Sequence, residues 1–74
     1  MTFYYREGCH LCEAFEEELQ IQQKQRYFEL ERVDVDSLPE LAERYGLRVP
    51  VLTYGDEVIC ESFLDPERLH AYVQ

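Results

Sequence analysis

The sequence is poor in basic residues and has no long apolar run. Seven lysines and arginines stand against 16 aspartates and glutamates, which gives a formal net charge of -9. Such a chain repels phosphate backbones and anionic lipid surfaces, so we expect neither a nucleic acid nor a membrane as its partner. No segment approaches the roughly 20 apolar residues of a membrane-spanning helix, and the N-terminus lacks the pattern of a secretory signal. We therefore expect a cytoplasmic protein and a monomer.

Cysteine is also scarce, with three residues in the whole chain. An odd number leaves at least one thiol without an intramolecular partner, which argues against a scaffold held together by disulfides. In a reducing compartment, a close pair of cysteines is typical of catalysis or of metal binding. The sequence also lacks a glycine-rich phosphate loop, internal repeats and a linker. Its 74 residues therefore predict a single domain over residues 1–74, with a small core.

The first third of the chain predicts a strand followed by a helix. Residues 2–5 (TFYY) have the aromatic and β-branched composition of a strand. From Cys9 onward, apolar residues recur at near-helical spacing between glutamates. This pattern predicts an amphipathic helix of about four turns that ends in the polar segment 22–26.

The middle of the chain predicts a second strand and a short helix. Residues 27–36 (YFELERVDVD) alternate between apolar and polar side chains, with a slip near Arg32 that predicts a bulge. Ser37 is the expected N-cap of the short helix, and Glu40 is its capping-box partner. Gly46 is expected to end this helix.

The last third predicts a hairpin and a final helix. Residues 49–54 and 57–60 have the composition of strands, and the intervening Gly55-Asp56 suits a type II′ turn. Asp65 as a cap, followed by Pro66, is a typical helix start. The resulting order, βαβαββα, predicts an α/β fold in which three helices flank a four-stranded mixed sheet.

Cys9 and Cys12 form a CxxC motif where the first strand gives way to the first helix. On a helical turn their Cβ atoms are about 5–6 Å apart, close enough for a disulfide. The unpaired N–H groups at the helix start favour a thiolate, so we expect the pKa of the Cys9 thiol to lie below that of free cysteine. Because the thiolate is the attacking species, Cys9 is the predicted nucleophile and Cys12 the resolving thiol.

Three segments resemble the glutaredoxin and thioredoxin families. They are YREGCHLC at residues 5–12, YGLRVPVL at residues 45–52 and FLDPERL at residues 63–69. The resemblance covers nearly the whole chain and implies a thioredoxin-like, more narrowly glutaredoxin-like, domain. It also implies a cis peptide bond before Pro50 and a Val49 backbone that faces the two sulfurs, where it pairs with the extended backbone of a substrate.

The same resemblance implies further residues in substrate binding. Arg6 falls where many glutaredoxins carry a basic residue that contacts a carboxylate of glutathione, and Asp65 lies near the family's acidic position for the γ-glutamyl end. Arg48 replaces the threonine of the family's Thr-Val-Pro and offers a second carboxylate contact. The family's Gly-Gly turn is replaced around residues 60–62, where Glu61 adds a charge that repels glutathione. Glutathione is therefore one candidate co-substrate, and no bound cofactor is expected.

These observations predict a thiol–disulfide oxidoreductase that acts on protein or low-molecular-weight disulfides and is restored by glutathione or a reductase of the thioredoxin-reductase kind. Two alternatives use the same cysteines: a non-catalytic interaction module and a metal-binding domain. A metal site would need Cys60 or His10 as an added ligand, because the chain has no second CxxC motif and no histidine pair. Otherwise we expect Cys60 in the core and His10 in solvent.

Overall fold

The computed structural model describes residues 1–73, and over that range strands and helices follow one another in the predicted order. The strands are β1 (Thr2–Tyr5), β2 (Glu31–Asp34), β3 (Val51–Tyr54) and β4 (Glu57–Glu61). The helices are α1 (His10–Gln25), α2 (Pro39–Tyr45) and α3 (Pro66–His70), and a short 3-10 helix, η1 (Val35–Ser37), precedes α2. Within residues 1–73, no helix is long and apolar enough to cross a membrane.

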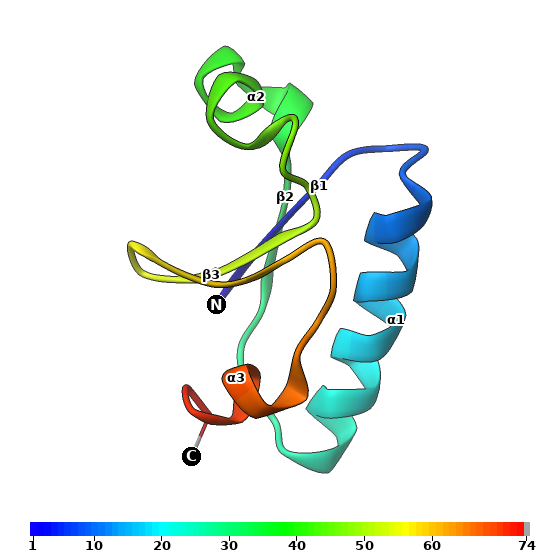
Figure 1. Ribbon diagram of the computed structural model, residues 1–74, viewed down its shortest axis with the longest axis vertical. Coiled ribbons are helices and arrows are strands. Elements are labelled where there is room, and N and C mark those ends of the chain that lie inside the picture. Colours follow the sequence, from blue (N-terminus) through cyan, green and yellow to red (C-terminus); the bar gives the residue numbers. More distant parts are fainter. Residues whose placement is uncertain (74) are drawn as a thin grey trace.

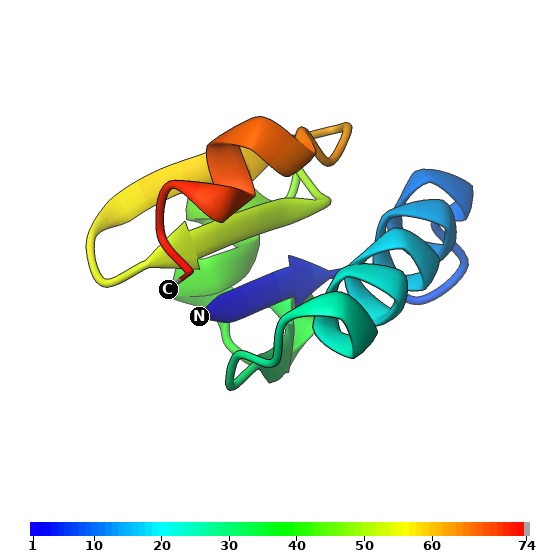
Figure 2. The ribbon, with the colours of Figure 1, turned by 90° about the horizontal axis from the view of Figure 1, so that it is seen from below.

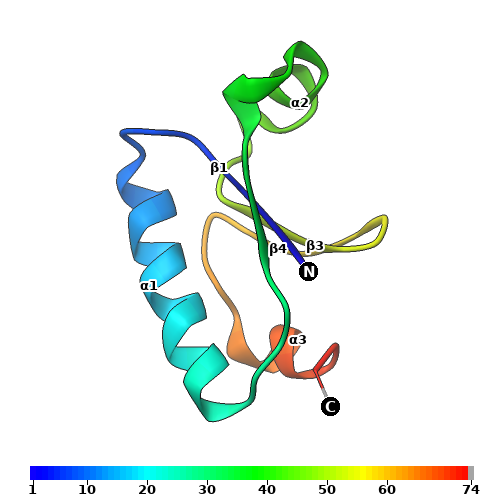
Figure 3. The same ribbon diagram turned by 180° about the vertical axis from the view of Figure 1, so that it is seen from behind.

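The four strands form one mixed sheet in the order β2-β1-β3-β4. Strand β1 is parallel to β2, while β3 is antiparallel to both β1 and β4. Helix α1 runs alongside the sheet, with α2 near one end of the molecule and α3 near the other (Figures 1 and 3). The predicted four-stranded mixed sheet with three helices is confirmed.

Successive residues of the central strands point to opposite faces of the sheet, which creates two cores. The larger core lies beneath α1 and α3 and includes Phe3 of β1 and Leu52 of β3. The smaller core lies beneath α2, where Val51 and Tyr45 are buried. There Tyr4 stacks on Tyr45 with ring centroids 4.3 Å apart. Helices α1 and α3 therefore cover one face, and α2 covers the other (Figure 2).

Helix α1 buries only part of the apolar side that the spacing predicts: Phe15 and Leu19 are buried, whereas Leu11, Ala14 and Ile21 are exposed. The helix also continues through the polar segment as far as Gln25. Its buried residues are Cys12, Phe15, Leu19 and Gln22. Gln22 is buried because its Oε1 lies 2.8 Å from Nε2 of His70 in α3, which satisfies the amide away from water. This contact joins the C-terminal half of α1 to α3 and holds the long helix against the sheet.

The prediction of a bulged strand over residues 27–36 is wrong at both ends. Strand β2 covers four residues, and its pairing with β1 is regular from Thr2 opposite Glu31 to Tyr5 opposite Asp34. Phe28 precedes the strand in a loop and is buried in the larger core, so its apolar character reflects packing rather than pairing. The register shift of the sheet lies between Leu52 and Thr53 of β3 instead.

The predicted cap of α2 is also wrong. Leu38 occupies the N-cap position and makes no side-chain capping bond, and Pro39 begins the helix. Ser37 belongs to η1, where its hydroxyl donates to the Asp34 carbonyl at 2.6 Å. Ser37 therefore bonds within the 3-10 helix that precedes α2, because a serine side chain can bond to nearby backbone groups in a turn as well as at a helix cap. Gly46 ends α2 as predicted.

Candidate functional site

Cys9 caps the N-terminus of α1 with its sulfur. Gly8 precedes it with φ of 73°, a left-handed value that glycine adopts easily and that turns the chain out of β1. Cys9 is extended, and its Sγ accepts a hydrogen bond from the Cys12 backbone N–H at 3.1 Å. An N-cap residue normally offers an oxygen to these unpaired N–H groups. Here a sulfur takes that place, at the helix end where negative charge is favoured.

The two sulfur atoms of the CxxC motif lie at disulfide-bonding distance but differ in exposure. The Cα atoms of Cys9 and Cys12 are 5.1 Å apart, within the span of about 4.4–6.8 Å that disulfides bridge. Cys9 is partly exposed, whereas only 3% of Cys12 is exposed. An incoming molecule can therefore reach the Cys9 sulfur far more easily than that of Cys12.

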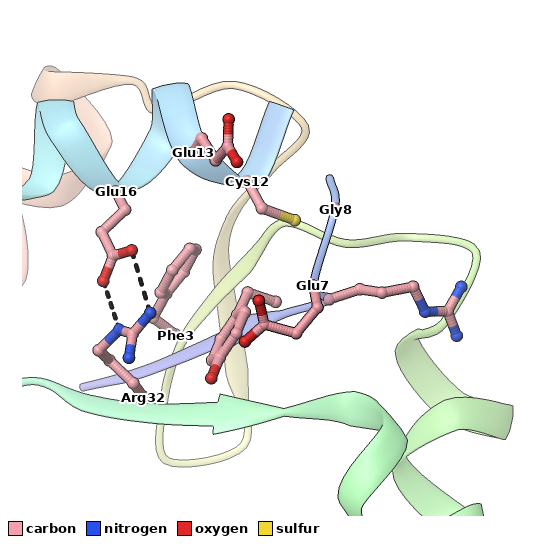
Figure 4. Close-up of a pocket in the computed structure, with 9 residues that line it drawn as sticks. Phe3, Glu7, Gly8, Cys12, Glu13, Glu16 and Arg32 are labelled. Carbon is pink, nitrogen blue, oxygen red and sulfur yellow. Dashed lines mark hydrogen bonds and ion pairs between the residues drawn. The ribbon is translucent and has the colours of Figure 1, made fainter. Parts of the chain in front are cut away.

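A small pocket of about 60 Å³ lies beside Cys12, between α1 and strands β1 and β2 (Figure 4). Across it, Arg32 of β2 forms a two-pronged ion pair with Glu16 of α1. The Arg32 guanidinium also lies 4.6 Å from the centroid of the Tyr5 ring, and its hydrogen bond to Glu16 raises the pKa of Arg32. The sequence analysis missed this pair, because locating Arg32 on the α1 side requires the register between β1 and β2.

The Val49–Pro50 peptide bond is cis and leads directly into β3. Val49 packs against the same core cluster as Cys9, so both residues border the larger core near the CxxC motif. The Val49 N–H donates to the Tyr45 carbonyl at 3.0 Å. The substrate pairing implied by the resemblance would therefore have to use the Val49 carbonyl rather than its N–H.

Arg6 is engaged in a structural contact. Its Nε and Nη2 atoms donate to the two carboxylate oxygens of Asp36 at 3.0 and 3.1 Å, and its Nη1 donates to the Gly46 carbonyl at 3.1 Å. These bonds tie the segment after β1 to η1 and to the end of α2. With its guanidinium bound in this way, Arg6 has to leave Asp36 before it can clamp the carboxylate of a substrate.

Arg48 is engaged in the same manner. Its Nε and Nη2 atoms donate to the two carboxylate oxygens of Glu61 in β4, both at 3.0 Å. The hydrogen bond from Arg48 lowers the pKa of the Glu61 carboxyl and in return raises the pKa of Arg48. Glu61 was expected to repel glutathione, and Arg48 was expected to attract one of its carboxylates. The two side chains pair with each other, so Arg48 neutralises the charge of Glu61.

Replacing Arg48 with glutamine is expected to raise the pKa of Glu61 toward its ordinary value, because the guanidinium that stabilises the carboxylate is removed. In the unmodified protein the pair stabilises the fold above the ordinary glutamate pKa of about 4.3, and that stabilisation is lost as the pH falls through the lower pKa. The side chains are 40% and 41% exposed, so the contribution is below about 1 kcal/mol.

The measurement is an NMR titration of the Glu61 side chain. Arg44→Gln is the matched control, because Arg44 lies over the Tyr45 ring as Arg48 does, at 5.1 and 5.4 Å from its centroid, whereas the ion pair of Glu61 is with Arg48. Identical Glu61 titrations in the unmodified protein and in Arg48→Gln would contradict the expected pairing.

Asp65 caps α3, as the sequence predicts. Its Oδ1 accepts from the Glu67 N–H at 3.0 Å, and Pro66 is the first helical residue. The side chain is exposed, so the same carboxylate also stands open to solvent near the end of β4.

Replacing Asp65 with alanine is expected to cost about 1 kcal/mol of unfolding free energy, because the Glu67 N–H loses its acceptor. Urea unfolding followed by circular dichroism measures the loss. Asp65→Asn is the control, since an amide oxygen still caps the helix and the midpoint should move little. An alanine variant as stable as the asparagine variant would show that the cap contributes nothing.

The two remaining candidate metal ligands, Cys60 and His10, differ in their surroundings. Cys60 is buried in β4 with 5% exposure, and its sulfur accepts from the Asp65 N–H at 3.4 Å, as expected for a core residue. The His10 side chain is 99% exposed, also as expected. Within residues 1–73, no group of three histidine, cysteine, aspartate or glutamate side chains is arranged to hold a metal ion.

Comparisons with known proteins agree with this arrangement. A family model described as a glutaredoxin-like domain (DUF836) matches residues 1–74. The solution NMR structure of protein Ne2328 from Nitrosomonas europaea is similar, with 41% sequence identity and a TM-score of 0.83 over 99% of this chain and 88% of that chain. No curated protein matches. With the predicted thioredoxin-like fold confirmed and the family model matching the chain from end to end, this protein belongs to the glutaredoxin-like domain family.

Proposed function

We propose that this protein is a thiol–disulfide oxidoreductase in which Cys9 is the nucleophile and Cys12 the resolving thiol. The observation that carries the proposal is the Cys9 sulfur, which is partly exposed and lies 3.1 Å from a backbone N–H at the start of α1. Hydrogen bonding and the helix dipole stabilise a thiolate there. The buried Cys12 thiol follows one helical turn later, at the distance needed to close a disulfide.

The proposed reaction has two exchange steps. The Cys9 thiolate attacks one sulfur of a substrate disulfide, so that a new sulfur–sulfur bond forms while the other substrate sulfur leaves with the electron pair and takes up a proton. The Cys12 thiolate then attacks the Cys9 sulfur and releases the second substrate thiol. The substrate disulfide gains two electrons, and the Cys9–Cys12 pair loses them.

The dithiol has to be restored by an external thiol. We propose a cytoplasmic thiol system for this role, either glutathione or a reductase of the thioredoxin-reductase kind, with protein or low-molecular-weight disulfides as substrates. A cytoplasmic glutathione pool is reducing enough to return many dithiol proteins to their reduced form.

The test is a redox titration of the intact protein. The protein is equilibrated across glutathione redox buffers, its free thiols are alkylated, and the modified cysteines are identified by mass. A reversible Cys9–Cys12 disulfide with a potential in the range of roughly −180 to −270 mV supports the proposal. Thiols that never pair would support a non-catalytic interaction module instead, and release of a bound metal during alkylation would support a metal-binding domain.

A further inference from the structure

An apolar groove begins at the redox motif and has no role in the exchange steps described above. It has a volume of about 310 Å³ and lies between α1 and the segment that joins β4 to α3. That segment runs beside α1 in both views (Figures 1 and 2). The lining side chains are Leu11, Ala14, Phe15 and Glu18 from α1, with Phe63 and Leu64 opposite them.

One wall of the groove includes a residue of the CxxC motif, and the other is hydrogen-bonded to the segment with the cis peptide bond. On one wall, Leu11 lies between Cys9 and Cys12 in the chain and is 48% exposed. On the other wall, Ser62 donates its N–H to the Pro50 carbonyl at 2.9 Å, which joins the groove to the cis peptide segment. Phe63 is 73% exposed at the groove mouth. Phe63 and Leu11 thus give the groove two exposed apolar side chains on opposite walls, one of them within the CxxC motif, and a contiguous exposed apolar surface of this kind is typical of one that a partner covers.

The charges around the site are unbalanced toward the negative. Of the arginines discussed above, Arg6, Arg32 and Arg48 are each paired with a carboxylate of the protein itself. Glu18 stands in the groove wall, and within residues 1–73 it contacts the Gln22 amide at 3.1 Å but no lysine or arginine within 4.0 Å. A carboxylate left without a cation beside an apolar surface complements a ligand that is both apolar and cationic.

We propose that this groove receives the apolar side chain next to the cysteine of a cationic polypeptide, so that the protein exchanges disulfides with such polypeptides in preference to glutathione disulfide. The inference rests on the proposed function, because it names the substrate class of the same two cysteines. Glutathione carries two carboxylates and no large apolar side chain. Glu18 would repel its carboxylates, the arginines are already paired with carboxylates of the protein, and glutathione would leave the groove empty.

The probes are mixed disulfides of thionitrobenzoate with four thiols. Three are end-blocked peptides, Lys-Leu-Cys-Lys, Lys-Ser-Cys-Lys and Glu-Leu-Cys-Glu, and the fourth is glutathione. Attack by Cys9 on the peptide sulfur releases coloured thionitrobenzoate, which reports the rate by stopped flow. Each rate is divided by the rate at which free mercaptoethanol, an uncharged thiol, attacks the same probe. This division cancels the intrinsic reactivity of each probe.

The Lys-Leu peptide is expected to react about ten-fold faster than the Lys-Ser peptide, since its leucine is removed from water in the groove. It should also exceed the Glu-Leu peptide and the glutathione probe by about ten-fold at low ionic strength, and this second preference should shrink in about 1 M salt. Glutathione reacting as fast as the Lys-Leu peptide would overturn the proposal.

Matched variants assign each preference to its residue. Phe63→Ser should reduce the Leu-over-Ser preference toward one. Ile21→Ser also removes a large exposed apolar side chain, but from a position of α1 outside the groove, and it should keep the preference. Glu18→Gln should reduce the preference for lysine over glutamate, and Glu17→Gln should not. Equal effects in a variant and its control would overturn the proposal.

Two further outcomes separate this inference from the proposed function. If the Cys9–Cys12 disulfide forms in the redox titration but the four probes react equally after normalisation, the substrate class is wrong and the oxidoreductase stands. If the disulfide never forms, both fail. Concentration-dependent dimers in sedimentation experiments, abolished by Phe63→Ser, would assign the groove to a second copy of the chain and overturn the peptide assignment.

Discussion

Replacing Cys9 with serine is expected to abolish disulfide exchange, lowering its rate by about 10³-fold or more. A hydroxyl at this position cannot supply the thiolate that attacks a disulfide, although it can still accept the hydrogen bond from the Cys12 N–H that the sulfur accepts at 3.1 Å. Helix capping and fold should therefore survive, and only the chemistry should be lost. The rate of disulfide reduction, with glutathione as the final electron donor, measures the effect.

Cys12→Ser should behave differently, which distinguishes the two roles. Cys9 still attacks, but the resolving thiol that would release the product is gone, so a mixed disulfide with the substrate accumulates on Cys9. Intact mass spectrometry detects this adduct directly. Cys60→Ser is the control, because Cys60 is a free, buried cysteine that is not part of the CxxC motif. A Cys9→Ser variant that keeps its activity, or that accumulates the substrate adduct on Cys12, would reverse the assigned roles.

Replacing Phe3 with alanine is expected to cost about 3–5 kcal/mol of unfolding free energy. Phe3 is fully buried in β1 and stacks on Phe15 of α1 and on Tyr5, with ring centroids 5.5 and 5.7 Å apart. A domain of this length is stabilised by only about 4–11 kcal/mol, at roughly 0.05–0.15 kcal/mol per residue. The single change therefore brings the protein close to unfolding, and α1 with its cysteine motif loses its main contact with the sheet.

Urea unfolding of the reduced protein measures this loss. Tyr27→Ala removes another aromatic ring, but one that is 74% exposed, and it should change the free energy by less than about 0.5 kcal/mol. If Phe3→Ala does not fold, Phe3→Leu keeps part of the buried volume and should still be measurably destabilised. Equal unfolding midpoints for the Phe3→Leu and Tyr27→Ala variants would refute the central packing role of Phe3.

Much of the fold follows from local patterns in the sequence. The apolar spacing predicts helix α1 and the burial of Phe15 and Leu19, and Asp65-Pro66 predicts the start of α3, because both signals operate within one or two helical turns. The predictions that failed concern residues with several local uses. Ser37 bonds within η1 instead of capping α2, and Phe28 fills the core from a loop instead of a strand.

The candidate site likewise has one part that local sequence predicts and another part that it does not. The CxxC motif at a helix start, with Cys9 before Cys12, is visible in the sequence because its geometry depends on consecutive residues. The roles of the arginines are not visible there. Arg6 pairs with Asp36, 30 positions along the chain, and Arg48 pairs with Glu61, 13 positions along.

The sequence by itself determined the CxxC motif at a helix start, the order of strands and helices, and the acidic charge of the chain. The tertiary structure decided which charges are neutralised, that Cys12 is buried while Cys9 is partly exposed, and that Leu11 and Phe63 line one groove. The physical reason is range. Helix dipoles, caps and turns act over a few residues, whereas ion pairs and apolar contacts depend on distances of a few ångströms between segments that only the packed sheet brings together.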